Sequence, residues 1–265
     1  MCSSDLSLHD DLRENILTDQ AATRSLDDYN GHGTHVAGII AASKDDKVMH
    51  GVAPQAKIIA VKWAGLRGVV PGIYDFDNHV INTNASVVNG SFGSYGYNKN
   101  VYDMVKHLVN DGAPNLVQVY AAGNDSNNNP LYPAIFADDA EMKGQLLAVE
   151  AFDINNNNIA YFSNRCGRIT RCLAAPGVNI YSTIPGNQYQ ALSGTSMAAP
   201  VVSGAVAVLQ SAWPNLNGKD IVDLLLLTAT PKKNNVNLLN LEGAVNSVRS
   251  EEHTSELQSP DHLVC

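Results

Sequence analysis

The chain has 265 residues, 45% hydrophobic and 16% charged, a composition typical of a folded globular protein, and it is long enough for one domain with a full core. Its formal net charge of -9 at pH 7 argues against nucleic acid or an anionic membrane surface as a partner, because both are bound through clustered Lys and Arg. The most apolar stretch, residues 198–209, is too short for a membrane span and is interrupted by Pro200 and Ser203.

Strands and helices are predicted to alternate along the chain. Apolar runs that end in Gly or Asn turns predict buried strands over residues 56–65, 85–93, 115–124 and 145–153. Helical periodicity predicts helices over residues 33–42, 73–84, 101–110, 196–213 and 218–228, and a short last helix after LLNLEGAV. The alternation predicts an α/β fold with a mostly parallel sheet covered on both faces, whose active residues gather at the carboxyl ends of the strands.

His32 lies between two glycines in NGHGTHVAG, at the start of a predicted helix. Small neighbours let a substrate and a partner side chain approach an imidazole closely. The pair His32 and His35 could bind a metal, but the helical metalloprotease pattern needs a Glu after the first His and a spacing of four, and both are missing here. A structural role for a single His stays as the alternative.

Polar residues follow two of the predicted strands. Asn124 ends VQVYAAGN, and Ser91, Phe92 and Gly93 end VVNGSFG, although each stretch alone could be a β-turn. Ser196 precedes a run of small apolar residues in LSGTSMAAP, where it is either a nucleophile or the cap of a buried helix.

Two of the four cysteines lie six residues apart in SNRCGRITRCLAAPG. Cys166 and Cys172 could close a short loop, and a disulfide there would indicate an oxidising compartment. Two nearby thiols in a reduced protein are the alternative.

The motifs GHGTH, NGSFG, AAGN and SGTSMAAP together resemble those of the subtilases, the subtilisin-like serine peptidases, in order and in spacing. The resemblance runs from about His9 to Val245. It implies a three-layer αβα fold with a mostly parallel central sheet, and a serine endopeptidase that hydrolyses peptide bonds through an acyl-enzyme. An α/β-hydrolase esterase does not fit, because its His follows the Ser in the chain and NGSFG is not G-x-S-x-G.

The resemblance also implies a role for each motif. Ser196 would be the nucleophile, and His32 the general base that takes its proton and returns it to the leaving amine. Asn124 and the backbone N–H of Ser196 would form the oxyanion hole, and His35 would be structural. The implied substrate-binding residues are Ser91, Phe92 and Gly93, whose backbone pairs with the substrate, and Ala121, Ala122 and Gly123, which wall the primary specificity pocket.

The stretches around Cys166 and Cys172, around Ser196, and at LLNLEGAV resemble those of the peptidase passenger domains of Gram-negative autotransporters. This implies an exported protein, extracellular or on the bacterial cell surface, with a Cys166–Cys172 disulfide and, in the parent, a C-terminal outer-membrane barrel. The expected partner is a peptide or protein substrate. No cofactor is expected; calcium is common in the family, but no acidic loop here is specific enough to name metal ligands.

A catalytic triad also needs a carboxylate that orients the imidazole. In the family this carboxylate belongs to a D-[ST]-G motif, seven residues before the His of a short segment that HDDL (from His9) resembles in this sequence. Seven residues before His9 stands Cys2 instead of an Asp. The motif D-[ST]-G occurs nowhere in the sequence. Asp5, Asp27 and Asp28 are poor substitutes because none ends an apolar strand. The first catalytic strand is therefore expected to be missing, and the chain to be inactive or nearly so.

Both ends of the chain resemble translated sequencing-library adapters, in MCSSDL and in RSEEHTSELQS. The first twelve residues have no apolar run typical of a signal peptide. Our hypothesis is that residues 1–6 and 249–265 are artefacts and that residues 7–248 are a truncated subtilase catalytic domain. The alternative is a non-catalytic homologue that binds peptides in its cleft, which predicts that the natural parent lacks the Asp.

Overall fold

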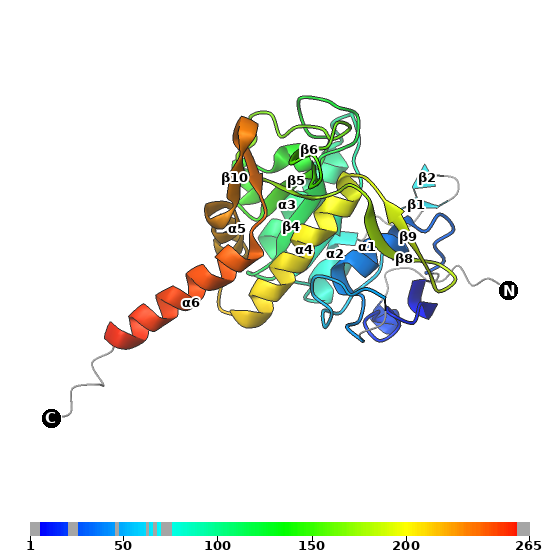
Figure 1. Ribbon diagram of the computed structural model, residues 1–265, viewed down its shortest axis with the longest axis horizontal. Coiled ribbons are helices and arrows are strands. Elements are labelled where there is room, and N and C mark those ends of the chain that lie inside the picture. The colour runs from blue at the N-terminus through cyan, green and yellow to red at the C-terminus, as the bar shows by residue number, and fades with distance from the viewer. Residues whose placement is uncertain are drawn as a thin grey trace.

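The computed structural model describes residues 6–20, 26–45, 48–61, 64–65, 68–69 and 76–258. Its centre is a seven-stranded sheet with helices on both faces (Figure 1). The strand order is β10-β11-β7-β5-β4-β3, with β6 paired to β5; the pairs from β3 to β11 are parallel, and β10 and β6 pair antiparallel. The strands are β3 (Val87–Gly90), β4 (Val117–Ala121), β5 (Leu146–Asp153), β6 (Asn158–Ile159), β7 (Cys172–Pro176), β10 (Thr230–Lys232) and β11 (Val236–Leu238).

Each face of the sheet has its own core. In β4, Val119 and Ala121 point into the core that α4 and α5 cover, whereas Tyr120 points into the core under α2 and α3, as the two-residue period of a strand requires. β4 is buried at every position, the polar Gln118 included, as is typical of a central strand that is covered on both faces. The α-helices are α1 (His32–Ala41), α2 (Phe76–Asn82), α3 (Lys99–Asp111), α4 (Thr195–Ala212), α5 (Gly218–Thr228) and α6 (Leu241–Gln258).

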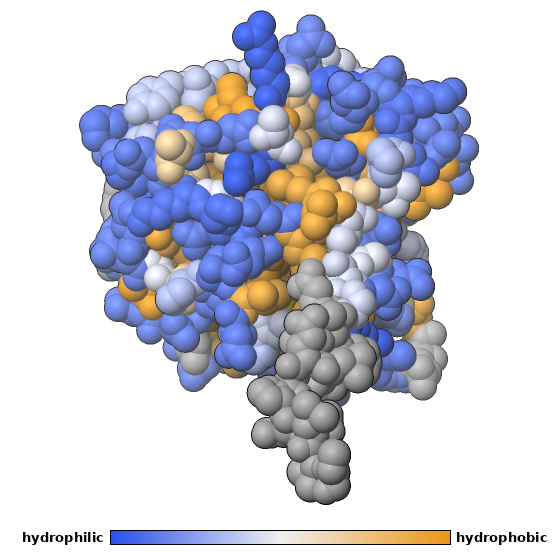
Figure 2. Space-filling model, turned by 90° about the vertical axis from the view of Figure 1, so that its left-hand side faces the viewer, coloured by the Kyte–Doolittle hydropathy of each residue, from blue (hydrophilic) through white to orange (hydrophobic). Residues whose placement is uncertain are grey.

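These features confirm the predicted α/β fold with a mostly parallel central sheet. Short 3-10 helices connect some of the elements: η1 (Leu6–Leu8), η2 (Thr18–Gln20), η4 (Ala134–Phe136), η5 (Ala140–Met142) and η6 (Lys233–Asn235). The side of the molecule that carries α5, α6 and β10 is hydrophilic around a central apolar area (Figure 2).

A hairpin that the sequence pattern did not reveal lies against α1. Its strands are β8 (Ile180–Ile184) and β9 (Gln188–Leu192). The hydroxyls of Ser182 and Thr183 donate to the carbonyls of His35 and Thr34, each at 2.8 Å. Gly38 permits this approach, because a Cβ there would come within 2.4 Å of both hydroxyl oxygens. β9 leads directly into α4, so the hairpin connects α1 to the start of that helix.

Two sequence expectations differ from the structure, and a third can be compared only in part. A strand was expected over residues 56–65. In its described part, Ile58 forms a parallel bridge with Ile16, and the short β1 (Ala64–Gly65) pairs with β2 (Gly68–Val69) outside the central sheet. Residues 62–63 lie outside the described part. The last helix is longer than expected. The helix expected over residues 73–84 is described from Phe76, since residues 73–75 lie outside the described part.

Pro200 and Ser203 do not interrupt α4. Among the described residues, α4 is the one helix long and apolar enough to cross a membrane, and 67% of that stretch is buried inside the protein. Its small and β-branched residues pack on the sheet. The burial is that of a core helix.

Candidate active site

Ser196 is the second residue of α4 and is half-buried. The residue before the helix, Gly194, is extended, with φ 160° and ψ 162°, and the chain turns there from the hairpin into the helix. The first N–H groups of a helix have no partner within it and carry partial positive charge. Ser196 is thus held where these groups meet solvent.

Ser91 and Ser196 are joined by two hydrogen bonds. The Ser91 hydroxyl donates to the Ser196 carbonyl at 2.9 Å, and the Ser196 hydroxyl donates to the Ser91 carbonyl at 3.1 Å. Pro200 explains the first bond: it stands four residues after Ser196 and has no N–H for the Ser196 carbonyl, so the loop supplies the missing donor.

Two further side chains hold Ser91 in place. Asn89, in β3, donates from Nδ2 to the Ser91 hydroxyl at 2.9 Å and accepts at Oδ1 from the Ser203 hydroxyl at 2.8 Å. The chain of bonds starts at Ser203 in α4 and returns to α4 at Ser196. Asn89 begins the NGSFG motif, but the sequence indicated a role for neither Asn89 nor Ser203, because the bond between them joins positions 114 residues apart.

Asn124 follows β4 and is exposed. Its Oδ1 accepts from the Thr195 N–H at 2.8 Å and from the Thr195 hydroxyl at 3.0 Å, so its Nδ2 is turned outward as a donor. A Cβ placed on Gly194 would lie 3.4 Å from Asn124 Nδ2 and 3.6 Å from Ser196 N. The structure therefore brings the two predicted oxyanion donors to the same small region.

Thr195 orients this part of the site; it lies within the SGTSMAAP motif, but the sequence alone indicated no role for it. It is buried, and its hydroxyl accepts from the Gly123 N–H at 3.1 Å while donating to Asn124. Asn164, also missed and fully buried, donates to the Ala122 carbonyl at 3.1 Å and accepts from the N–H of Asp125 at 2.9 Å. Buried polar groups with all bonds formed make the loop after β4 rigid.

The two predicted substrate-binding segments both lie against Leu131. A Cβ on Gly93 would come within 2.9 Å of Leu131, and one on Gly123 within 2.8 Å. Ala121 and Ala122 are buried beside them, and Phe92 packs edge-on against Tyr120 with ring centroids 6.0 Å apart. Gly123 has φ 110°, a conformation that favours glycine.

His32 is the first residue of α1, and Asp28 caps this helix. One Asp28 oxygen accepts from the Gly31 N–H at 3.2 Å, and the other accepts from the N–H and the hydroxyl of Thr34 at 2.7 and 2.8 Å. Burial lowers the pKa of His32 below its usual value, and the negative charge of Asp28 opposes this in part. The imidazole is therefore neutral near pH 7.

No hydrogen bond joins the imidazole of His32 to Ser196 in the part of the chain that the structure describes. The Ser196 hydroxyl is bonded to Ser91 instead. His35 lies deeper, fully buried, with Nε2 at 2.9 Å from the Gln190 carbonyl, and burial lowers its pKa as well. His35 thus connects α1 to β9.

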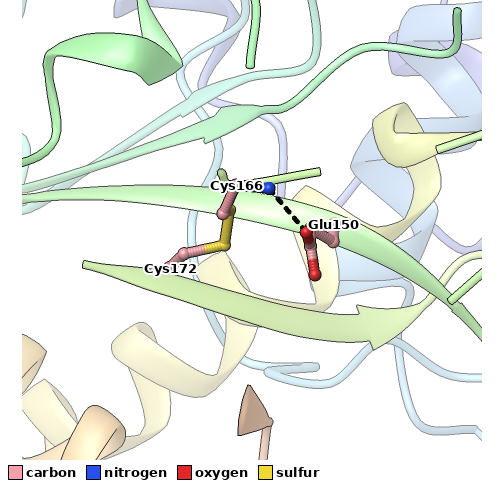
Figure 3. A group of neighbouring side chains, drawn as sticks. All are labelled: Glu150, Cys166 and Cys172. Carbon is pink, nitrogen blue, oxygen red and sulfur yellow. Dashed lines mark hydrogen bonds between the residues drawn. A yellow bond between two sulfur atoms is a disulfide. The ribbon is translucent and has the colours of Figure 1, made fainter. Parts of the chain in front are cut away.

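Cys166 and Cys172 form a disulfide, and Glu150 lies beside it (Figure 3). A carboxylate oxygen of Glu150 accepts from the Cys166 N–H at 2.6 Å. Burial raises the pKa of Glu150, which this bond and the charge of Arg165 oppose. Among the described residues, Glu150, Cys166 and Cys172 form the one group of three side chains whose ligand atoms lie close enough together to bind a metal ion. The two sulfur atoms are bonded to each other, however, and are not available as the thiolates that bind metals.

Comparison with known proteins agrees with this geometry. A family model, described as the subtilase family, matches residues 5–245. Subtilisin BL of Lederbergia lenta is 37% identical over 208 residues, which cover 78% of this chain and 72% of that protein. The thermostable alkaline protease of Halalkalibacterium halodurans is 38% identical over 212 residues, covering 78% of this chain and 54% of that protein.

Among solved structures, that of a mutant of the protease domain of PatA superimposes with a TM-score of 0.77 at 25% identity. The match covers 95% of this chain and 94% of that one.

Proposed function

Since this chain belongs to the subtilase family of serine peptidases, we propose that Ser196 is its nucleophile, in a reaction that hydrolyses peptide bonds through an acyl-enzyme. The observation that carries the proposal is the convergence of Asn124 Nδ2 and the Ser196 N–H beside Gly194. Donors so placed stabilise the oxyanion that forms when a hydroxyl attacks a carbonyl. One such side-chain donor contributes about 3 to 4 kcal/mol, a value measured in a subtilisin.

His32 is the proposed general base. A neutral imidazole can take the proton of Ser196 and return it to the leaving amine, and burial favours the neutral form. The Ser91–Gly93 backbone would pair with an extended substrate, and Ala121, Ala122 and Gly123 would wall the primary specificity pocket. The small side chains of this wall leave room for many substrate side chains.

The chain as it stands is proposed to be inactive or nearly so. Both oxygens of Asp28 are committed to the backbone and hydroxyl of α1, and the sequence has no D-[ST]-G. Loss of the triad carboxylate costs on the order of ten-thousandfold in turnover in a subtilisin. An N-terminally truncated catalytic domain, residues 7–248, accounts for both features.

The setting proposed is outside the cell or at the bacterial cell surface, in an exported parent of the autotransporter type with an outer-membrane barrel. The Cys166–Cys172 disulfide supports it, because such bonds persist in oxidising compartments. The proposed substrate is a peptide or protein. The proposed reaction needs no cofactor, and calcium ligands stay unassigned.

A second candidate is a non-catalytic homologue that binds peptides in its cleft. The bond from the Ser196 hydroxyl to the Ser91 carbonyl, in place of one to His32, favours it. It predicts a folded cleft without a reactive serine.

Labelling with a fluorophosphonate separates the two candidates. The chain as it stands is compared with one extended at its amino end by an apolar strand that ends in Asp-Ser-Gly. We expect Ser196 to be labelled in the extended chain at least about a thousandfold faster, and Ser196→Ala to abolish the label. An extended chain that unfolds cooperatively yet leaves Ser196 unlabelled would reject the peptidase and favour the peptide binder.

A further inference from the structure

Leu131 lies against both segments that are proposed to wall the primary specificity pocket. A Cβ placed on Gly93 would come within 3.1 Å of Leu131 Cδ1, and a Cβ placed on Gly123 would come within 2.9 Å of the same carbon. One methyl group of Leu131 thus faces both glycines. Since neither glycine has a side chain, the space between them is partly filled by Leu131.

The backbone also places Leu131 between the two segments. Its N–H donates to the Ala122 carbonyl at 2.8 Å, and the next residue, Tyr132, exchanges two hydrogen bonds with Ser94, at 2.9 and 3.0 Å. Successive residues of an extended chain direct their N–H and C=O groups to opposite sides. The chain at residues 131–132 therefore has one segment on each side, and Leu131 is half-buried there, so solvent reaches its side chain.

Hydrogen bonds fix the separation of the two walls. The Tyr95 hydroxyl donates to Asp125 Oδ1 at 2.6 Å, and these residues stand two positions after Gly93 and Gly123. Behind Gly123, the buried Asn164 would come within 2.5 Å of a Cβ placed on the glycine, and its side chain is hydrogen-bonded through both its oxygen and its nitrogen. The walls cannot move apart without breaking these bonds.

We propose that Leu131 forms the base of the primary specificity pocket and limits cleavage to peptides with Gly, Ala or Ser before the scissile bond. This inference rests on the proposed peptidase function, because it assigns the substrate class of the site where Ser196 attacks. The side chain of the substrate residue enters between the two glycines when its carbonyl oxygen lies at the oxyanion donors. A methyl or hydroxymethyl group fits above Leu131, whereas a Phe or Leu side chain overlaps with it. Leu131 thus takes up room that the small walls leave.

Peptidyl phosphonates test this assignment in the amino-terminally extended chain. Two diphenyl phosphonates of otherwise identical sequence differ only in the residue that carries the phosphorus, which is the analogue of Ala in one and of Phe in the other. We expect the Ala probe to label Ser196 at least about tenfold faster than the Phe probe, because the pocket excludes the ring. Equal rates, or faster labelling by the Phe probe, would overturn the proposal.

Variants of Leu131 locate the exclusion. Leu131→Gly opens the base of the pocket, so the rate of the Phe probe relative to the Ala probe should rise at least about tenfold. Leu131→Ala opens it less and should change the ratio in the same direction, which provides a second variant if the glycine chain does not fold. Leu131→Ile is the matched control, since it keeps the volume of the side chain and should keep the preference for the Ala probe. An unchanged ratio in a variant that circular dichroism shows to be folded, with Gly or Ala at this position, would overturn the role of Leu131.

A small fluorophosphonate without a peptide portion separates this inference from the peptidase itself. Its rate in each variant is the reference for the peptidyl probes, so a general change in the reactivity of Ser196 divides out. Labelling by the fluorophosphonate together with equal rates for the Ala and Phe probes would reject the role of Leu131 and leave the peptidase standing. A folded extended chain that the fluorophosphonate does not label would reject the peptidase and, with it, this inference.

Discussion

Ser91 and Ser196 each donate a hydroxyl to the other's backbone carbonyl, at 2.9 and 3.1 Å, across 105 residues of sequence. The exchange fixes the start of α4 against the carboxyl end of β3. Pro200 makes it necessary, because the Ser196 carbonyl has no donor within the helix.

Ser91→Ala should therefore destabilise the fold. It leaves the Ser196 carbonyl and Asn89 Nδ2 without their present partners, and we expect a loss of about 1 to 2 kcal/mol in the free energy of unfolding. Urea denaturation measures it. The control is Ser94→Ala, whose exposed hydroxyl donates only to the Gly96 carbonyl at 3.3 Å, and which should change stability by less than about 0.5 kcal/mol.

Pro200→Ala should make Ser91 less important. Alanine at this position supplies a helical N–H to the Ser196 carbonyl, so Ser91→Ala should cost about 1 kcal/mol less in the Pro200→Ala background. A double-mutant cycle by urea denaturation gives this coupling directly. Purely additive effects of the two substitutions would show that the hydroxyl does not replace the missing N–H.

Thr195→Val should disturb both stability and the oxyanion donors. Valine keeps the shape but leaves the buried Gly123 N–H without an acceptor, a loss of about 1 to 3 kcal/mol, and it removes one of the two hydrogen bonds that orient the Asn124 amide, so that only the bond from the backbone N–H of residue 195 remains. In the amino-terminally extended chain, we expect Ser196 labelling to slow by about tenfold. Thr228→Val, which removes only a hydroxyl bonded to the Leu224 carbonyl within α5, should leave labelling unchanged.

Asp28→Asn should move the titration of His32. Burial lowers the pKa of His32 and the charge of Asp28 raises it, so removal of that charge lowers the pKa further. NMR of the imidazole protons should give a midpoint below 6.5 in the parent chain and a still lower one in Asp28→Asn. Asp27→Asn is the matched control, and an equal shift in both variants would contradict the role of Asp28.

Glu150→Gln should change the pH dependence of stability. Burial raises the pKa of Glu150, so the folded state holds this proton more tightly than the unfolded state does, and stability falls as the pH rises through the folded pKa. Glutamine can still accept from the Cys166 N–H but does not ionise. Relative to the parent, the variant should gain stability as the pH rises above 4.5, the usual pKa of a Glu side chain, in urea denaturation with the disulfide intact, whereas Glu141→Gln at the surface should not.

The sequence predicted α3, α4 and α5 to within a few residues, because their limits are marked locally. Asn98 and Asn217 cap α3 and α5 with their side chains, and apolar periodicity fills the interiors. The hairpin β8–β9 escaped prediction because it is not part of the central sheet and much of its surface is exposed. In the described part of the strand expected over residues 56–65, pairing is limited to a bridge at Ile58 and to the short β1, since pairing depends on a neighbour that local sequence does not specify.

The motifs also identified the residues that the structure gathers at the carboxyl ends of β3 and β4. Asn124, Ser91 and Ser196 were recognisable from short motifs with characteristic spacing. The roles of Thr195, which lies within one of these motifs, and of Asn164 were not recognisable, because they consist of hydrogen bonds to residues 72 and 42 positions away, which only folding reveals. Sequence patterns name the reacting groups more readily than the groups that hold them.

The contacts of the β8–β9 hairpin with α1 also bear on how the protein opens. Two hydroxyls of β8 and the imidazole of His35 hold α1 on the hairpin, and β9 continues into α4. The helix that begins with His32 and the helix that carries Ser196 are therefore connected through the hairpin, without any contact that involves β3. We therefore expect the amides of α1, of the hairpin and of the start of α4 to exchange with solvent together, as one cooperative unit. Fluctuations that open the β3 edge would leave the spacing of His32 and Ser196 intact.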